Sequence, residues 1–223
     1  MSAVELVVAR CQEDISWMRN VPLTLRLAVY DKSGGSVWPG SIPLPNIGRE
    51  AHTYLHHLTE RYDSLAEWTV FCQGKPFDHA PDFHTVLRRM VAGNFPEKRF
   101  QWLGFLIDTD DRRGRRLFVR WSKNPEGREL DGEGFHRALF GAPSPETYLF
   151  HGGAQFIAHR DLIRKRSREF YQNALAISRD FPDAAHCFER VWDRVFGVEG
   201  VDPARMEGQP TRYLKPIRKL MEG

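Results

Sequence analysis

Short runs of apolar residues, separated by polar clusters, occupy the first eighty positions of the chain. They lie at Val4–Arg10, 23–30 and 67–74, and polar residues follow each of them. Short apolar runs that end at turn signals are typical of buried β-strands. Strands with apolar residues on both faces are expected in a sheet that helices cover on both sides.

A helical pattern replaces these runs between the second and third predicted strands. Five apolar residues recur there at i, i+3, i+4, i+7 and i+11: Ala51, Tyr54, Leu55, Leu58 and Tyr62. This stripe predicts a helix over residues 49–62, after an irregular loop rich in proline and glycine. The order strand, strand, helix, strand predicts an α/β domain, in which ligands bind beyond the carboxyl ends of the strands.

The second half of the chain is less regular. Its predicted elements are, in order, a helix at 82–93, two strands within 99–121 around the turn DDRRG, a strand at 145–159 broken by Gly152 and Gly153, and helices at 160–180 and 184–197. We expect one domain over residues 1–197, and a tail at 198–223 that packs on its surface.

The composition is that of an ordinary globular protein. The 223 residues are 41% hydrophobic and 27% charged, with a formal net charge of +3, and no nucleic-acid-binding pattern is evident. Three scattered cysteines without a CxxC spacing are evidence against a zinc cluster or a disulfide framework. No apolar run approaches about 20 residues, and acidic residues come early, so we expect a cytoplasmic protein without a signal peptide or transmembrane segment.

Charged residues gather at the start of the predicted helix at 49–62. Gly48 would allow a ligand to approach the backbone closely. The helix N-terminus, together with the guanidinium of Arg49, could then bind a diphosphate. Alternatively, Glu50 offsets the helix dipole and pairs with Arg49.

Three histidines follow in the same helix. His52 and His56 are four residues apart and share a face, as two metal ligands can. Packing is the simpler interpretation for this pair because no third ligand is evident. We expect His57 to lie at the surface.

Two acidic segments are candidate metal sites. Asp78 and His79 follow the third predicted strand, and a carboxylate with an imidazole could hold Mg²⁺ or Mn²⁺ beside substrate phosphates. A turn in which Asp78 caps the next segment is the alternative. Asp108 and Asp110 form a literal DxD, but the basic residues that follow suggest an exposed hairpin turn with compensated charge.

The paired glycines at 152 and 153 interrupt a strand, which is a way to bring the backbone close to a ligand. His151 and Gln155 on either side could then contact a sugar or acceptor hydroxyl, although a β-bulge would also explain the glycines. Glu189 is the candidate general base that would deprotonate an acceptor hydroxyl. An ion pair of Glu189 with a neighbouring arginine is the alternative.

Residues 160–168 carry a dense run of arginine and lysine. Such a run is usually a solvated helix face. The alternatives are that it holds a polyanionic acceptor or lies against anionic lipid headgroups in a peripheral membrane contact.

Several segments in order along the chain resemble a bacterial and fungal family catalogued as a domain of unknown function. They are VVARCQEDISW, VYDKSG, LPNIGREAHTYLHHL, TVFCQGKPFDH, GAQFIAHRDLI and FERVWDRVFG. Members of that family in turn look like GT-A glycosyltransferases. This chain differs from the pattern in having CQED and YDKS where the family has asparagine, and in lacking a DxD after VFCQG.

The resemblance implies a GT-A-like mixed sheet and the transfer of a sugar from a nucleotide-sugar donor to a glycan or other hydroxyl acceptor, as in polysaccharide biosynthesis. The donor-binding residues would be Glu13, Asp14, Asp31, Arg49, Glu50, Gln73, Gly152, Gly153 and Gln155. Glu189 and His151 would be catalytic, and Asp78 with His79 would hold Mn²⁺ or Mg²⁺. A non-catalytic nucleotide- or carbohydrate-binding protein and a metal-dependent hydrolase are the alternatives.

Overall fold

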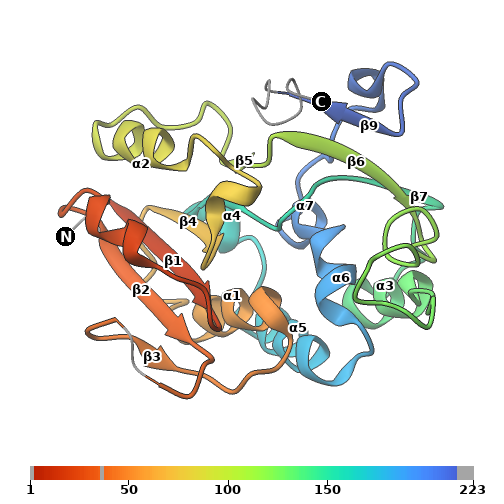
Figure 1. The fold of residues 1–223 in the computed structure, drawn as a ribbon, viewed down its shortest axis with the longest axis horizontal. Helices are drawn as coiled ribbons and strands as arrows, with labels where there is room; N and C mark the ends of the chain where they lie inside the picture. Colours follow the sequence, from red (N-terminus) through yellow and green to blue (C-terminus); the bar gives the residue numbers. More distant parts are fainter. Residues whose placement is uncertain (1–2, 36–37, 215–223) are drawn as a thin grey trace.

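Three parallel strands form the centre of a six-stranded sheet (Figure 1). The computed structural model describes residues 3–35 and 38–214. In it β1 (Val4–Arg10) pairs in parallel with β2 (Arg26–Asp31) on one side and with β4 (Trp68–Gln73) on the other. The full order is β3-β2-β1-β4-β8-β5, in which β3 (Ile42–Pro43) is parallel to β2. The strand β8 (Phe156–His159) runs antiparallel to β4 and to β5 (Phe100–Trp102).

Successive residues of β1 contribute to two different hydrophobic cores, because side chains alternate between the faces of a strand. Val7 and Ala9 face a core shared with α1 (Arg49–Glu60), α5 (Arg168–Asp180) and α6 (Ala184–Glu189). Leu6 and Val8 face a core shared with η1 (Ser16–Asn20) and α2 (Phe83–Val91). Both faces of the sheet are therefore covered, as the apolar runs predict.

A second, antiparallel sheet has the order β7-β6-β9. It consists of β6 (Leu106–Asp111), β7 (Thr147–His151) and β9 (Thr211–Tyr213). The predicted interruption at Gly152 and Gly153 separates β7 in this sheet from β8 in the larger one. The remaining short elements are η2 (Pro76–Asp78), α3 (Gly132–Phe140), α4 (Arg160–Ile163), α7 (Trp192–Val195) and η3 (Pro203–Met206).

The chain thus has the predicted α/β architecture of one domain with a mixed sheet flanked by helices, but the second half departs from the expected elements. No second strand follows β6 directly; turns occupy that segment because Asp110 and Asp111 accept hydrogen bonds from the backbone amides of Arg113, Arg115 and Arg116. The partners of β6 are β7 and β9 instead. The helix α3 is an element that our sequence analysis did not predict.

Both long helices predicted near the C-terminal end are divided in two. The first is divided into α4 and α5, and Ser167 caps the N-terminus of α5 by accepting a hydrogen bond from the amide of Phe170. The second is divided into α6 and α7 at Arg190, whose side chain donates to the carbonyl of His186 and to Asp110. Side-chain hydrogen bonds determine where these helices begin and end, and the spacing of apolar residues does not indicate those positions.

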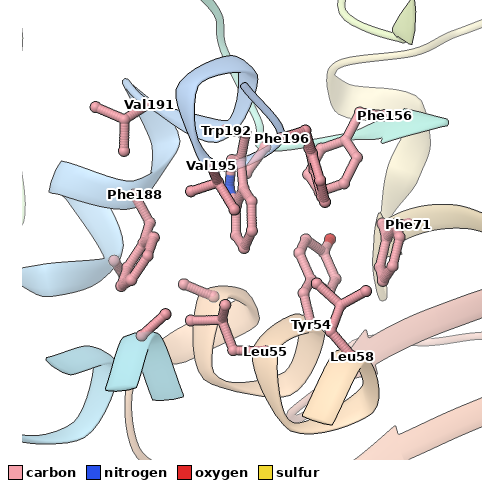
Figure 2. Packing of buried hydrophobic residues seen from close by; sticks show 14 of the residues in the cluster. Tyr54, Leu55, Leu58, Phe71, Phe156, Phe188, Val191, Trp192, Val195 and Phe196 are labelled. Carbon is pink, nitrogen blue, oxygen red and sulfur yellow. The ribbon is translucent and has the colours of Figure 1, made fainter. Parts of the chain in front are cut away.

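Aromatic side chains from distant parts of the chain meet around Trp192, which is fully buried (Figure 2). Its ring lies 5.0 Å from that of Phe156 and 5.5 Å from that of Phe188, measured between centroids. The ring centroid of Tyr54, in α1, lies 5.7 Å from that of Trp192. This cluster joins α1, the larger sheet and the C-terminal helices into one core.

We expect Trp192→Ala to lower the free energy of unfolding by about 3–5 kcal/mol, because the substitution leaves a large cavity in a core that is packed from several elements. Urea denaturation followed by circular dichroism would measure this. Leu23→Ala, at an almost fully exposed position, is the control and should change stability by less than about 0.5 kcal/mol. A loss below about 1 kcal/mol for Trp192→Ala would contradict the packing described here.

Candidate functional site

The chain reverses direction across the sheet between β1 and β4. From β1 it moves to β2 and β3 on one side, and it then crosses through α1 to β4 on the other side of β1. In open α/β sheets a crevice forms outside the carboxyl ends of the strands at such a switch point, and ligands bind there. Here that position lies between Arg10, at the end of β1, and Gln73, at the end of β4.

A cavity of about 210 Å³ occupies this position, and we call it the inner cavity. Its walls are mostly polar or charged and come from the ends of β1, β2 and β4 and from the start of α1. They are formed by Ala9, Arg10, Cys11, Glu13, Lys32, Asn46, Arg49, Glu50 and Gln73. A cavity of this composition suits the charged part of a ligand.

A second cavity of about 350 Å³ shares Arg49, Glu50 and Gln73 with the first, and we call it the outer cavity. The two are therefore parts of one cleft. Its other polar walls are His79, Asp108, His186, Glu189 and Arg190, and its apolar walls are Leu117, Phe118, Trp121 and Phe150. Gly152 and Gly153 complete the lining.

The backbone at the start of α1 is held in an unusual conformation. Gly48 and Arg49 both have positive φ values, of 59° and 48°. A Cβ on Gly48 would lie 2.5 Å from the carbonyl oxygen of Ser178, so glycine is required there. Lys32 donates from Nζ to the carbonyl oxygens of Ile47, at 2.7 Å, and of Arg49. This arrangement brings α1 into the cleft with no side chain capping its N-terminus.

Positive and negative charges alternate along the cleft. The Arg49 guanidinium lies 5.3 Å from the centre of the Trp121 ring, and its Nε is 3.6 Å from Glu50 Oε2. Burial raises the pKa of Glu50, and the nearby charge of Glu189 adds to this effect. Burial also lowers the pKa of Lys32 to about 8, against the opposing effect of the Glu50 carboxylate. Groups with such shifted pKa values in a cleft are typical of functional sites.

Glu189 is fixed at the end of α6 by the loop between β7 and β8. Its Oε1 accepts a hydrogen bond of 2.6 Å from the amide of Gly153. Gly153 has a φ of 93°, and a Cβ there would lie 2.2 Å from Cγ of His79. The loop therefore needs glycine at this position, and it brings Glu189 and His79 to the same cleft.

Strained backbone also accumulates around the cleft. Among the described residues, four that are not glycine have positive φ, and three of them border this region: Arg49, Ala154 and Asp183. Ala154 follows Gly153 directly, and Asp183 immediately precedes α6, which carries His186 and Glu189. Such residues cost free energy and tend to cluster at functional sites.

Of the predicted site residues, Glu13, Arg49, Glu50, Gln73, His79, Asp108, Gly152, Gly153 and Glu189 line the cleft. Glu13 turns its carboxylate toward the loop after β1, where Oε2 accepts a 2.7 Å hydrogen bond from the amide of Cys11. Asp31 lies just behind the cleft, in a buried ion pair of 2.7 Å with Arg10. Burial alone would raise the pKa of Asp31, but hydrogen bonds from Ser33 and the Arg10 charge lower it.

The other predicted residues do not line the cleft. Asp14 is exposed and accepts hydrogen bonds from the amide and hydroxyl of Ser16. His151 lines a different cavity, where its ring stacks on Trp102 at 5.7 Å. Gln155 is buried and donates to the carbonyl oxygen of Pro76.

The acidic residues proposed as metal ligands have protein partners. Asp78 is exposed and lies 3.3 Å from Nζ of Lys75. Asp108 accepts hydrogen bonds from Arg116 and Thr211, and Asp110 forms a buried ion pair with Arg190 at 2.5 Å. Within the described residues no group of three or more histidine, cysteine, aspartate or glutamate side chains has a metal-binding arrangement.

The histidines of α1 belong to the packing of the helix. His52 and His56 share a face, as predicted, and their rings stack at 6.4 Å. The expectation that His57 lies at the surface was wrong. This residue is fully buried, and its Nδ1 lies 3.0 Å from the hydroxyl oxygen of Tyr30. The buried face of α1 is wider than the narrow apolar stripe that the sequence shows, so it includes His57.

Several arginines of residues 160–168 hold backbone carbonyls within the fold. Arg164 donates to the carbonyl oxygens of Tyr62 and Asp63, after α1, and Arg166 donates to those of Arg194 and Val195, at the end of α7. These guanidinium groups thus satisfy carbonyl oxygens near the C-terminal ends of α1 and α7. A contact of this segment with lipid headgroups or a polyanion stays a prediction.

Among the residues of the cleft that were not predicted from the sequence are Lys32, Trp121, His186 and Arg190. Lys32 stands directly after Asp31 at a strand end, so its position was a usable signal. Trp121 gave no such signal, because its segment was assigned to a strand. His186 reaches the cleft on α6, which packs against α1, and Arg190 reaches it beside its partner Asp110 of β6.

No helix in the described parts of the chain is long and apolar enough to cross a membrane. No curated protein is a significant match to the sequence. A family model does match, over residues 6–208, which includes every residue of the cleft. The chain therefore belongs to the family described as "Protein of unknown function (DUF3431)".

Proposed function

We propose that this protein is a glycosyltransferase that uses a nucleotide-activated sugar. The observation that carries the proposal is the two-part cleft at the switch point of the sheet, in which a charged inner cavity opens into an outer cavity beside a fixed carboxylate. In this proposal the larger sheet acts as the nucleotide-binding sheet of a GT-A-like enzyme. The acceptor is a hydroxyl of a glycan or a related molecule.

The donor diphosphate would lie in the inner cavity. Lys32 and Arg49 supply positive charge there, and the uncapped start of α1 supplies backbone amides with partial positive charge. These groups would also stabilise the charge that develops on the leaving diphosphate. Burial raises the pKa of Glu50. In its protonated form, Glu50 repels the donor diphosphate less than the carboxylate would.

The sugar would then extend into the outer cavity, next to Glu189. In an inverting reaction the acceptor oxygen attacks the anomeric carbon as the bond from that carbon to the phosphate oxygen breaks. The nucleoside diphosphate leaves with the bonding electrons, and the acceptor proton passes to Glu189. The hydrogen bond from Gly153 holds one oxygen of this carboxylate and leaves the other available.

The donor set of the cleft does not fit the divalent cation that the sequence resemblance implies. Asp108 and Asp110 are neutralised by arginines, and Asp78 faces solvent outside the cleft. No step above therefore relies on Mn²⁺ or Mg²⁺. Lys32 and Arg49 carry the charge neutralisation in the proposal.

Binding of the donor is the first test. We expect at least one of the UDP, GDP, ADP and CMP sugars to raise the melting temperature by several degrees when present well above its Kd, because a ligand that binds only the folded state stabilises it. The screen is run with and without Mn²⁺, and a shift that appears only with Mn²⁺ would contradict the metal-free arrangement. A flat response to every donor would overturn the proposal.

Replacement of Glu189 is the second test. We expect Glu189→Gln to lower the turnover of the bound donor by about 10²- to 10⁴-fold, because the amide cannot accept the acceptor proton. Donor binding should persist, since the amide oxygen can still accept the hydrogen bond from Gly153. The matched control is Glu97→Gln, at an exposed position outside the cleft. Unchanged turnover in Glu189→Gln would exclude this residue as the base.

The pH dependence of donor binding is the third test. The bound diphosphate favours protonated Lys32, so affinity should be full below pH 8 and should fall as the pH rises above the free-protein pKa of about 8. Lys32→Arg keeps its charge at these pH values, so this variant should lose the alkaline decrease. Isothermal titration calorimetry between pH 7 and 10 measures both. An identical decrease in wild type and variant would contradict the role of Lys32.

A further inference from the structure

We propose that the outer cavity is a binding site for a pyranose ring, which stacks on Trp121. As an acceptor site, this assignment rests on the transferase function proposed above. The binding of the sugar itself can be measured without any transfer. No sequence motif predicted that Trp121 and its apolar neighbours Leu117, Phe118 and Phe150 would line a cavity.

One wall of the outer cavity is apolar and aromatic. Leu117, Phe118, Trp121 and Phe150 form it, and Trp121 keeps part of its surface open. The ring of His186 packs against Trp121, with centroids 4.7 Å apart. The C–H face of a pyranose is apolar, and it gains free energy when an aromatic ring takes it out of water.

Three residues of the aromatic wall, Leu117, Phe118 and Trp121, lie in a segment without strand or helix that side-chain hydrogen bonds hold in place. The buried side chain of Asn124 donates to the carbonyl oxygens of Phe118, at 3.1 Å, and of Arg128, at 2.9 Å. Arg128 in turn pairs with Asp183 at 3.1 Å, which connects the segment to the start of α6. A ligand would therefore find the platform already ordered, and less entropy would be lost on binding.

The polar walls of the same cavity carry the groups that sugar hydroxyls need. The carboxylates of Asp108 and Glu189 accept hydrogen bonds, and the carboxyl group of Glu50 accepts them or donates one when it is protonated. The imidazoles of His79 and His186 can accept or donate hydrogen bonds. Burial lowers the pKa of His186 to about 4, and the Arg49 charge acts in the same direction, so this ring is neutral near pH 7. An apolar wall and hydrogen-bond acceptors in one cavity match a ring that has an apolar face and hydroxyl donors at its edge.

A nucleobase could also stack on Trp121, but the surrounding charges favour a sugar. Ionised carboxylates only accept hydrogen bonds. Nucleobases present N–H donors beside carbonyl or ring-nitrogen acceptors, and carboxylates repel those acceptors, whereas every hydroxyl of a pyranose can donate to them. Arg49 lies over the Trp121 ring, 5.3 Å from its centre, with Nη1 at 3.4 Å from Nε2 of His186. Lys123 Nζ lies 5.8 Å from the same ring centre.

Titration with simple glycosides tests the proposal. The probes are the methyl pyranosides of β-D-glucose, β-D-galactose and α-D-mannose, together with uridine, and saturation-transfer NMR identifies the ring protons that contact the protein. We expect at least one pyranoside to bind in the millimolar range with saturation concentrated on one face of its ring. Trp121→Leu, which keeps apolar bulk but loses the ring, should weaken binding about three- to tenfold. Trp121→Phe should retain most of the affinity.

The matched control is Trp102→Leu, which removes a half-buried tryptophan that also packs on an imidazole, in a cavity away from the cleft. It should leave pyranoside binding unchanged. The proposal is overturned if no pyranoside binds, if Trp121→Leu binds as wild type does, if both leucine variants lose affinity equally, or if uridine displaces the pyranoside from Trp121. Binding of pyranosides without any response to nucleotide sugars would support this site and overturn the transferase; the reverse result would overturn this site alone.

Discussion

The parallel pairing of β1 with both β2 and β4 is the constraint on which the rest of the structure depends. It aligns three carboxyl ends at one edge of the sheet, and the crossover through α1 brings a helix N-terminus to the same edge. Arg10, Lys32 and Gln73 reach the inner cavity for this reason alone. A different strand order with the same sequence would separate these side chains.

The smaller sheet and the C-terminal helices complete the cleft from the other side. The loop at Gly152 and Gly153 joins β7 to β8, and the amide of Gly153 binds Glu189 at the end of α6. The buried pair of Asp110 and Arg190 connects β6 to the residue that follows α6. The outer cavity therefore lies between two sheets and is framed by contacts between elements that are far apart in sequence.

Strained backbone and buried charge are concentrated at the cleft, where the larger sheet meets the smaller sheet and the C-terminal helices. Arg49 and Ala154 adopt positive φ without being glycine, and the shifted pKa values of Lys32, Glu50 and His186 all have burial as their largest cause. Each of these features costs stability. The large aromatic core around Trp192 (Figure 2) offsets that cost.

The sequence by itself determined the elements that depend on neighbours along the chain: the buried strands β1, β2 and β4, the helix α1 and the interruption at the paired glycines. Periodicity and turn residues are local signals, so they suffice for those. Tertiary structure alone decided that β6 pairs with β7 and β9 and that Ser167 and Arg190 divide the long helices. It also decided that His57 is buried and that Trp121 and His186 line the same cavity as Glu189. These outcomes depend on side-chain hydrogen bonds and on packing between distant segments, which leave no period in the sequence.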